Sequence, residues 1–319
     1  ALLALFLGVA TIILLTIMIQ IEKRGHYMSV SKVKTTIVKQ KIRNPILNVL
    51  AHVYAYLLFL IYVIPVALVV LFSFTDSATI ASKHLTLSSF TLENYISIFQ
   101  KASSYKPFVV SIAYSAIAAS FVAIIVLIAC RILQKRKDRL GGALEYGLLI
   151  PWLLPTTLMA LGLITTYNTP RVWMFNKVLT GTSVIMLIGY IIIKIPFTLR
   201  MTKAAFFSLD DSLEDAARNM GAKPFYTFMR VQLPIILPTV LAIFALNFNG
   251  LLGDYDMSVF MYHPLNKPLG VYIKSLTDSE TNADNAALTF VYAVLMMIIS
   301  AAVMYLVYGR GNKVDKNKD

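Results

Sequence analysis

Apolar residues gather along the chain in long runs that contain no charged side chain. Seven such runs are present, at residues 1–21, 44–75, 107–130, 146–170, 178–193, 231–253 and 285–309. A helix needs about 20 apolar residues to cross a bilayer. The runs therefore predict membrane-spanning helices. The run 178–193 is short, and it reaches the required length if Lys194 extends its ammonium group to the interface.

Composition supports the same class of protein. Hydrophobic residues make up 58% of the chain and charged residues only 14%, whereas soluble domains average about 25% charged residues. A soluble helical core of this size would need charged outer faces, and none of the runs carries one. We therefore expect an all-α membrane protein.

The net charge of +13 is distributed unevenly among the connecting segments. If the loop after Leu209 lies inside and the spans alternate, the inner segments hold 22 Lys and Arg against 9 acids, and the outer segments hold 7 against 7. This asymmetry follows the positive-inside rule. It predicts a multi-pass protein of the bacterial cytoplasmic membrane with a cytoplasmic C-terminus. The basic segments are orientation signals and secondarily contacts for anionic membrane lipid, and no nucleic acid is expected as a partner.

The segment 208–234 between the fifth and sixth runs has the pattern of a helix, a turn and a second helix. Ser208 is a candidate N-cap, Gly221 suits the position after a helix end, and Pro224 suits the start of the next helix. The first helix carries an apolar stripe at helical spacing, which consists of Leu209, Leu213, Ala216, Ala217 and Met220. An amphipathic helix lying on lipid would share this pattern, but an anionic leaflet would repel its four acids, Asp210, Asp211, Glu214 and Asp215.

This segment resembles the cytoplasmic signature of bacterial ABC importer permeases. That signature reads Glu-Ala-Ala, three residues, Gly, nine residues, Ile, one residue, Leu-Pro. The chain matches it in register, with Asp215, Ala216 and Ala217, then Gly221, then Val231, Leu233 and Pro234. Asp215 and Val231 depart conservatively from Glu and Ile, and Glu214 is a second candidate for the acidic role.

The resemblance implies a six-helix ABC importer transmembrane domain at 49–310, with a coupling loop at 208–238. In that family the short helix sits in a groove of the ATPase subunit, where small residues allow close packing. The implied partners are an ABC ATPase dimer, a second permease half (fused, identical or distinct), and an extracellular or periplasmic solute-binding protein.

The run 1–21 predicts a helix in addition to the six of this domain. We expect it to be the trailing helix of a preceding permease half, joined by a cytoplasmic linker at 22–48, in a fused permease of about twice this core. Residues 311–319 would form a cytoplasmic tail. A longer reading frame upstream would support this organisation.

Motifs of enzymes are missing from the sequence. There is no G-x-x-x-x-G-K-[ST] loop to hold ATP phosphates and no H-E-x-x-H or G-x-S-x-G pattern. We therefore expect no enzyme activity and no cofactor in this chain, and ATP hydrolysis by a separate subunit. Cys130 is the single cysteine, and the four histidines have no metal-site spacing. A secondary transporter or channel is the alternative of another class, but it would predict relay acids or charged rings within the spans.

Polar groups within the spans mark candidate positions for the substrate pathway. These are Thr156 and Thr157 after the helix-breaking Pro151 and Pro155, then Asn247 and Asn249, and then Asp254 and Asp256 at the outer end. Helix packing is an equal explanation for the asparagines. Lys194 is expected to extend towards the cytoplasmic surface.

The stretch from Gly253 to Phe260, with Pro264-Leu and Pro268-Leu-Gly beyond it, looks like the ferric-iron and aminophosphonate branch of these importers. Fused twelve-helix permeases are common in the ferric branch. Ferric iron is therefore the expected substrate, with polyamine, aminophosphonate and sulfate-type anions as alternatives.

Overall fold

The computed structural model describes residue 42 and residues 44–309, apart from residues 83, 137, 171, 173–175 and 278–284. The predictions made for the helix at 1–21, for most of the linker at 22–48 and for the tail at 311–319 lie outside the described residues.

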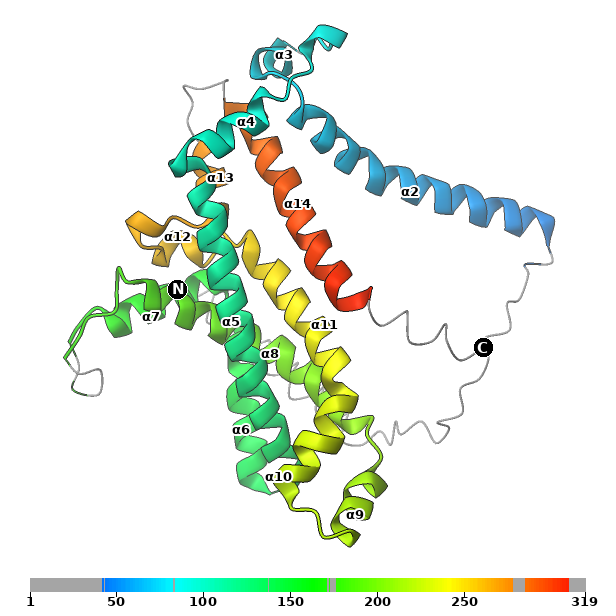
Figure 1. The fold of residues 1–319 in the computed structure, drawn as a ribbon, viewed down its shortest axis with the longest axis vertical. Coiled ribbons are helices and arrows are strands. Elements are labelled where there is room, and N and C mark those ends of the chain that lie inside the picture. The colour runs from blue at the N-terminus through cyan, green and yellow to red at the C-terminus, as the bar shows by residue number, and fades with distance from the viewer. Residues whose placement is uncertain are drawn as a thin grey trace.

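Long apolar helices dominate the described part of the chain (Figure 1). Five are long and apolar enough to cross a membrane: α2 (Pro45–Ser73), α5 (Ala102–Lys135), α8 (Ser183–Phe207), the continuous segment Pro224–Leu252 and α14 (Ala286–Tyr308). A bent pair, Arg139–Leu153 with Thr156–Tyr167, makes a sixth candidate. The all-α membrane fold with six core spans, predicted from the charge-free runs, is confirmed.

Proline residues break the third of these spans, as the sequence predicts. α6 (Arg139–Leu149) passes into a 3-10 turn, η2 (Ile150–Leu153), and α7 (Thr156–Tyr167) leaves at 108° to it. Pro151 starts the turn and Pro155 caps α7, because a proline lacks the N–H that a continuing helix would need. The span is therefore bent sharply rather than straight.

The last-but-one span contains an irregular turn near its start. α10 (Pro224–Thr227) leads into the π-helical segment η4 (Phe228–Gln232), and α11 (Leu233–Leu252) continues in regular α form. Single π turns inside α-helices are rare and occur often at functional sites.

Short helices cover the end of the bundle at which α2 ends and α14 begins. They are α3 (Ser77–Ser82), η1 (Leu87–Ser89), α4 (Glu93–Gln100), α12 (Ser258–Met261), η5 (Pro264–Asn266) and α13 (Leu269–Thr277). Hydrogen bonds between these short helices and the long helices hold them in place. Ser111 of α5 accepts a hydrogen bond from the Leu269 backbone N–H at 2.8 Å, and Asn94 donates to the carbonyls of Ser73 and Thr75.

The core lies where α5, α8 and α11 pack together. Its largest cluster joins residues of these helices with Leu149 of α6: Val122, Val126, Ala129, Cys130, Leu199, Phe206, Ile236 and Val240. Buried polar residues are few, and those in the helix interfaces are mostly hydroxyl or amide side chains that bond across helices. Such bonds replace the hydrophobic effect, which is weak between helices in lipid.

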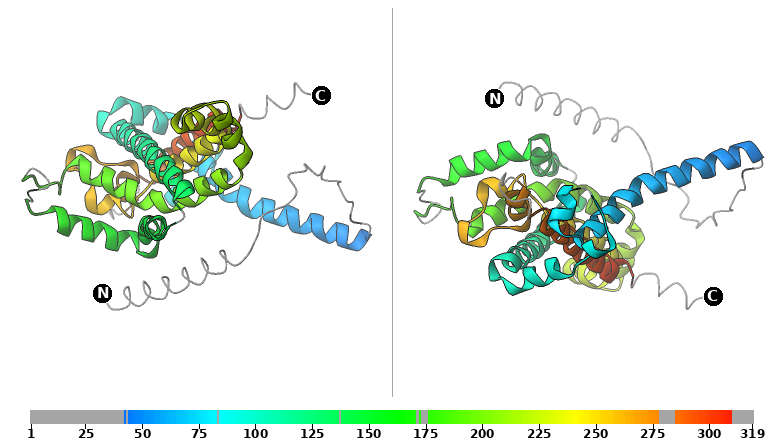
Figure 2. Two further views of the ribbon diagram at one scale, coloured as in Figure 1. Left: turned by 90° about the horizontal axis from the view of Figure 1, so that it is seen from below. Right: turned by 90° about the horizontal axis from the view of Figure 1, so that it is seen from above.

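α2 stands apart from this core. Figures 1 and 2 show it projecting from the bundle, with contact to α14 near its end. Almost all of its large apolar side chains are exposed, and the 18-residue window that defines it as a span contains no buried residue. A helix that is apolar all round and uncovered by its own domain requires lipid or another membrane segment around it.

Candidate functional site

The segment that matches the signature forms a short helix, α9 (Asp211–Asn219), at one end of the bundle. We call this the motif end. Asp210 caps α9, because its side chain accepts a hydrogen bond from the Ser212 backbone N–H at 3.1 Å. The predicted cap at Ser208 is wrong, since Ser208 ends α8 and its N–H bonds to the Ala204 carbonyl.

Gly221 ends this helix as predicted. Its φ is +80°, a left-handed conformation that side chains other than glycine adopt at a cost. The N–H groups of Gly221 and Ala222 bond to the carbonyls of Arg218 and Ala217 at 2.9 and 3.0 Å, so the last turn is closed. A Cβ at Gly221 would meet nothing within 4 Å; the surrounding space is open.

The two sides of α9 differ in what they face. Ala217 is buried against its own chain, with 4% exposure, and Glu214 is half-buried. Asp215, Ala216 and Met220 are exposed, and the side chain of Met220 is 81% accessible. The predicted apolar stripe is therefore divided. One part fixes the helix to the bundle, and the other part is presented outwards next to Gly221.

Glu214 holds α9 to two of the core helices. Its carboxylate receives two hydrogen bonds from the Arg131 guanidinium of α5, at 3.0 and 3.1 Å. Gln232, the last residue of η4, donates a third at 3.1 Å. The hydrogen bond from Arg131 is the main reason why the pKa of Glu214 is lowered from its ordinary value, so this carboxylate stays ionised. Bidentate Arg–carboxylate pairs fix geometry as well as adding energy.

Arg131 and Gln232 were not predicted from the sequence. Arg131 lies 83 residues before Glu214, and only the packing of α5 against the segment after α9 brings them together. Asp215 lies on the other side of the helix, with 69% of its side chain exposed and Arg218 at 3.9 Å. Of the two acids that the sequence offered, Glu214 is engaged within the chain and Asp215 faces outwards.

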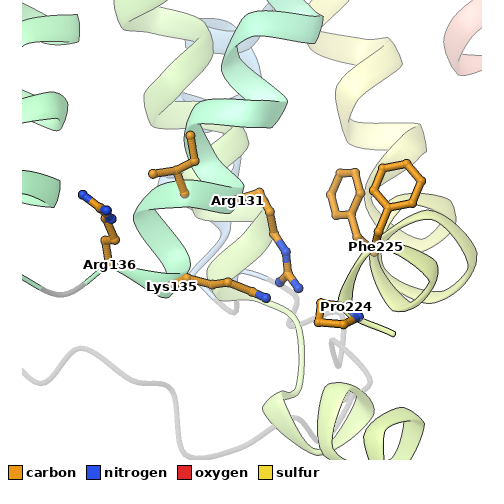
Figure 3. A pocket seen from close by; sticks show the side chains of 7 residues that line it. Arg131, Lys135, Arg136, Pro224 and Phe225 are labelled. Atoms are coloured by element: carbon orange, nitrogen blue, oxygen red, sulfur yellow. The ribbon is translucent and has the colours of Figure 1, made fainter. Parts of the chain in front are cut away.

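A pocket of about 400 Å³ lies beside this ion pair, between the end of α5 and the start of the next span. Figure 3 shows Arg131 and Lys135 pointing from α5 towards Pro224 and Phe225. The guanidinium of Arg131 also lies 5.8 Å from the ring centroid of Phe228, a cation–π distance. Basic and aromatic side chains thus line one hollow next to α9.

The remaining signature residues form the start of the following span. Val231 is in η4, and Leu233 and Pro234 begin α11. Val231 and Leu233 are half-buried, whereas Pro234 is exposed. Leu233 packs against the core cluster. The x-Leu-Pro part of the signature therefore anchors α11 and does not share the outward face of α9.

The candidate pathway residues are not gathered in one place. Asn247 is buried and donates a 2.7 Å hydrogen bond to Thr198 of α8, which is helix packing. Thr156 and Thr157 begin α7, and Asp256 is exposed after α11. Only Asn249 and Asp254 line a common pocket, of about 410 Å³, between α11 and α14.

Lys194 of α8 reaches Gly250, one of the residues that line this pocket, although Lys194 is not itself part of the lining. A Cβ at Gly250, which lines the pocket, would lie 2.8 Å from the Lys194 Nζ. Gly250 is near the end of α11 that lies away from the motif end. The expectation that Lys194 extends towards the surface at the motif end is therefore wrong, because its ammonium reaches across to α11. Among the described residues, no group of three or more His, Cys, Asp or Glu side chains is placed to hold a metal ion.

A bundle of apolar helices that presents a capped helix with this signature at one end is the transmembrane domain of an ABC importer. The chain belongs to the family of binding-protein-dependent transport system inner membrane components, whose model matches residues 36–313.

Known relatives agree with this family. The chain is 37% identical over 308 residues to a probable ABC transporter permease of Sinorhizobium fredii, a match that covers 96% of this chain and 53% of that protein. It is 24% identical over 212 residues to a putative 2-aminoethylphosphonate transport system permease of Salmonella paratyphi A, covering 66% of this chain and 78% of that protein. The chain thus spans about half the length of the Sinorhizobium relative.

The fold also matches a solved structure, that of a bacterial ABC transporter involved in the import of the acidic polysaccharide alginate. The TM-score is 0.67, with 14% identity, over 84% of this chain and 96% of the matched chain. At this identity the likeness concerns the fold alone.

Proposed function

We propose that this chain is one half of a fused ABC importer permease, and that α9 is the helix through which a separate ATPase drives it. The family supports the importer class, and the Sinorhizobium relative, of which the match covers 53%, supports the fused organisation. In this proposal the motif end faces the cytoplasm, as the excess of basic residues in the inner segments predicts.

The division of α9 into two sides is the observation that carries the proposal. A helix that docks into another protein needs one side fixed to its own domain and one side free. Glu214 and Ala217 supply the fixed side, and Ala216, Met220 and Gly221 supply the free side. Asp215 and Arg218 stand at its edge, where a polar rim around an apolar contact is expected.

The contacts of Glu214 explain how force on α9 would reach the spans. Arg131 belongs to α5 and Gln232 to the π-helical start of the α11 span. A displacement of α9 by the ATPase would therefore move α5 and α11 together, without passing through a flexible loop. These two helices and α8 form the core, so their movement would change the access to any cavity between them.

The remaining partners follow from the exposed surfaces. α2 is uncovered except near its end, where it contacts α14, and we assign its apolar surface to the second permease half and to membrane lipid. The short helices at the end away from α9, from α3 to α4 and from α12 to α13, would receive the solute-binding protein.

We consider two alternative solutes for this importer. The sequence between Gly253 and Phe260 resembles the ferric-iron and aminophosphonate branch as a whole. The fused organisation favours ferric iron, whereas the relative from Salmonella is named for 2-aminoethylphosphonate. Uptake of radiolabelled ferric ion and of 2-aminoethylphosphonate by the same membrane vesicles distinguishes them.

A matched pair of glycines provides the test of ATPase docking. Gly221 and Gly181 both have positive φ, at 80° and 77°, and at neither would a Cβ meet an atom within 4 Å. Gly181 lies just before the start of α8. Gly221 lies just after α9, the helix that follows the other end of α8. Gly221→Trp should abolish co-purification with the co-expressed ATPase, and Gly181→Trp should preserve it. A complete complex with Gly221→Trp would refute the proposal.

A further inference from the structure

Lys194 is an unpaired charge inside a helix that crosses the membrane. It lies near the middle of α8, and among the described residues no acid lies within 4 Å of its ammonium group and no hydrogen bond is made by it. Burying an ammonium without a partner is unfavourable, and ionisable residues within spans usually mark the route of a ligand. Gly250 accommodates the group, because a side chain there would collide with Nζ at 2.8 Å.

The pocket next to Gly250 has three polar side chains in its lining, Asn249, Asp254 and Ser300. Asn249 lies in its wall, and the Asn249 Oδ1 is buried without a hydrogen-bond partner. A buried amide oxygen without a donor is a rare feature that needs a reason. Met296, Met297 and Ser300 of α14 complete the wall opposite. The pocket thus combines an apolar side with an amide acceptor that no group of the described chain satisfies.

Asp254 lies four residues after Gly250, just beyond the end of α11, and hydrogen bonds fix its position. Its Oδ2 accepts hydrogen bonds from the Ser258 N–H and Oγ at 3.1 and 2.8 Å. The Ser258 Oγ is also hydrogen-bonded to the Tyr190 hydroxyl at 2.5 Å, one turn before Lys194 on α8. Gly270 lets α13 approach the Asp254 backbone, where a Cβ would lie 2.4 Å from its carbonyl oxygen. These contacts engage Oδ2 and fix the orientation of the carboxylate.

Lys194 and Asp254 can carry opposite charges, yet among the described residues they do not form an ion pair within 4 Å. A chain that used them only to neutralise one another would bring them into contact, since a close pair offsets more of the desolvation. Lys194 is therefore available to a solute as a cation, and Asp254 and Asn249 as acceptors.

We propose, on the basis of the importer function proposed above, that Lys194, Asn249 and Asp254 form a contact site for a small zwitterionic solute within the permease. The oxyanion of the solute bonds to the Lys194 ammonium. An ammonium group of the solute donates to Asp254 and to the Asn249 amide oxygen. A metal cation without an anionic carrier would be repelled by Lys194 and would not suit the site.

Uptake by the complete transporter, with its ATPase and binding protein in proteoliposomes, tests this site. The probes are 2-aminoethylphosphonate and taurine, which are zwitterions, and ethylphosphonate, which lacks the ammonium group. Lys194→Met should reduce uptake of both zwitterions about tenfold to a hundredfold, the loss expected for one charged hydrogen bond. Lys194→Arg should retain part of the uptake, because it keeps the charge.

The second variant separates the two ends of the solute. Asp254→Asn should reduce uptake of 2-aminoethylphosphonate about tenfold relative to ethylphosphonate, because only the former presents a cation to Asp254. Co-purification with the ATPase should stay at the wild-type level in both variants, because neither residue belongs to α9. This distinguishes loss of the solute site from failure of the importer function, which Gly221→Trp reports.

Three results would overturn the site. One is uptake of the zwitterions by Lys194→Met at the wild-type rate. Another is an equal effect of Asp254→Asn on 2-aminoethylphosphonate and ethylphosphonate. The third is a wild-type transporter that imports ferric ion and neither zwitterion.

Discussion

The two ends of the core handle their charges in opposite ways. At the motif end, the carboxylate of Glu214 receives hydrogen bonds from Arg131 and Gln232 of the same chain. Near the other end of α11, Lys194 has no partner within 4 Å among the described residues, and the Asn249 oxygen has no donor. A charge satisfied within the chain fixes the position of an element. A polar group left unsatisfied at membrane depth costs free energy, and such groups often mark the route of a ligand. In our proposals the first region therefore transmits a displacement, and the second binds a solute.

Removing the arginine of the motif end should have the largest effect. Arg131→Met leaves the half-buried Glu214 charged and without its main partner, which we expect to destabilise the docking of α9 by about 3 kcal/mol. Trypsin cleavage at Arg218 and Lys223 should then be about a hundredfold faster. The control is Lys135→Met, one turn further on α5, because Lys135 lies 4.0 Å from Glu214 and is half exposed. Equal cleavage of the two variants would show that Arg131 does not hold α9.

Neighbouring alanines on α9 test the division between its two sides. Ala217→Leu should destabilise the motif end by about 2 kcal/mol, since the buried site has no room for three further carbons. Ala216→Leu should leave thermal stability unchanged and weaken ATPase binding, because Ala216 is exposed. Thermal unfolding in detergent and co-purification measure the two effects. The division is refuted if both variants behave alike in both measurements.

Two asparagines of α11, two residues apart, allow a polar group that is paired within the chain to be compared with one that is not. Asn247→Ala loses the 2.7 Å hydrogen bond to Thr198 and should cost about 1 kcal/mol, lowering the apparent melting temperature by about 2–4 °C. Asn249→Ala removes an oxygen without a partner, so its melting temperature should match that of the wild type while zwitterion uptake falls. Melting temperatures in the reverse order would contradict the assignment of Asn247 to packing and Asn249 to the pocket.

Lowering the pH should detach α9 from the bundle, and this is the smallest of the expected effects. Because the folded-state pKa of Glu214 is lowered from 4.5, chiefly by the hydrogen bond from Arg131, its contribution to stability is present above that value. The contribution is lost as the pH falls through the lower, folded-state pKa. Amide hydrogen exchange of α9 should therefore accelerate below pH 4.5, after correction for the intrinsic exchange rate. In Arg131→Met the release should occur at higher pH. An unchanged pH profile in that variant would argue against the ion pair.

The sequence predicts those features that depend on local pattern. The charge-free runs give the spans, Pro151 and Pro155 give the bend, and Gly221 gives the left-handed helix end, because each depends on neighbours within one or two turns. The ion pair of Glu214 depends on a residue 83 positions away, and no local pattern points to it. Lys194 was misplaced for the same reason. Only the packing of α8 against α11 shows that the space beside Gly250 receives its side chain. The cap of α9 was misplaced by two residues because Ser208 and Asp210 are both good N-caps.

The π-helical turn at Phe228–Gln232 bears on the number of residues that the signature places between Gly221 and Leu233. A π turn takes up one residue more than an α turn over the same rise. The number of residues between Gly221 and Leu233-Pro234 therefore includes the extra residue of the π turn, which sets the orientation of α9 relative to α11. Deleting one residue within 228–230 would convert the turn into regular α-helix and rotate α9 by about 100° relative to α11. Glu214 would then face away from Arg131, although every residue of the signature would still be present.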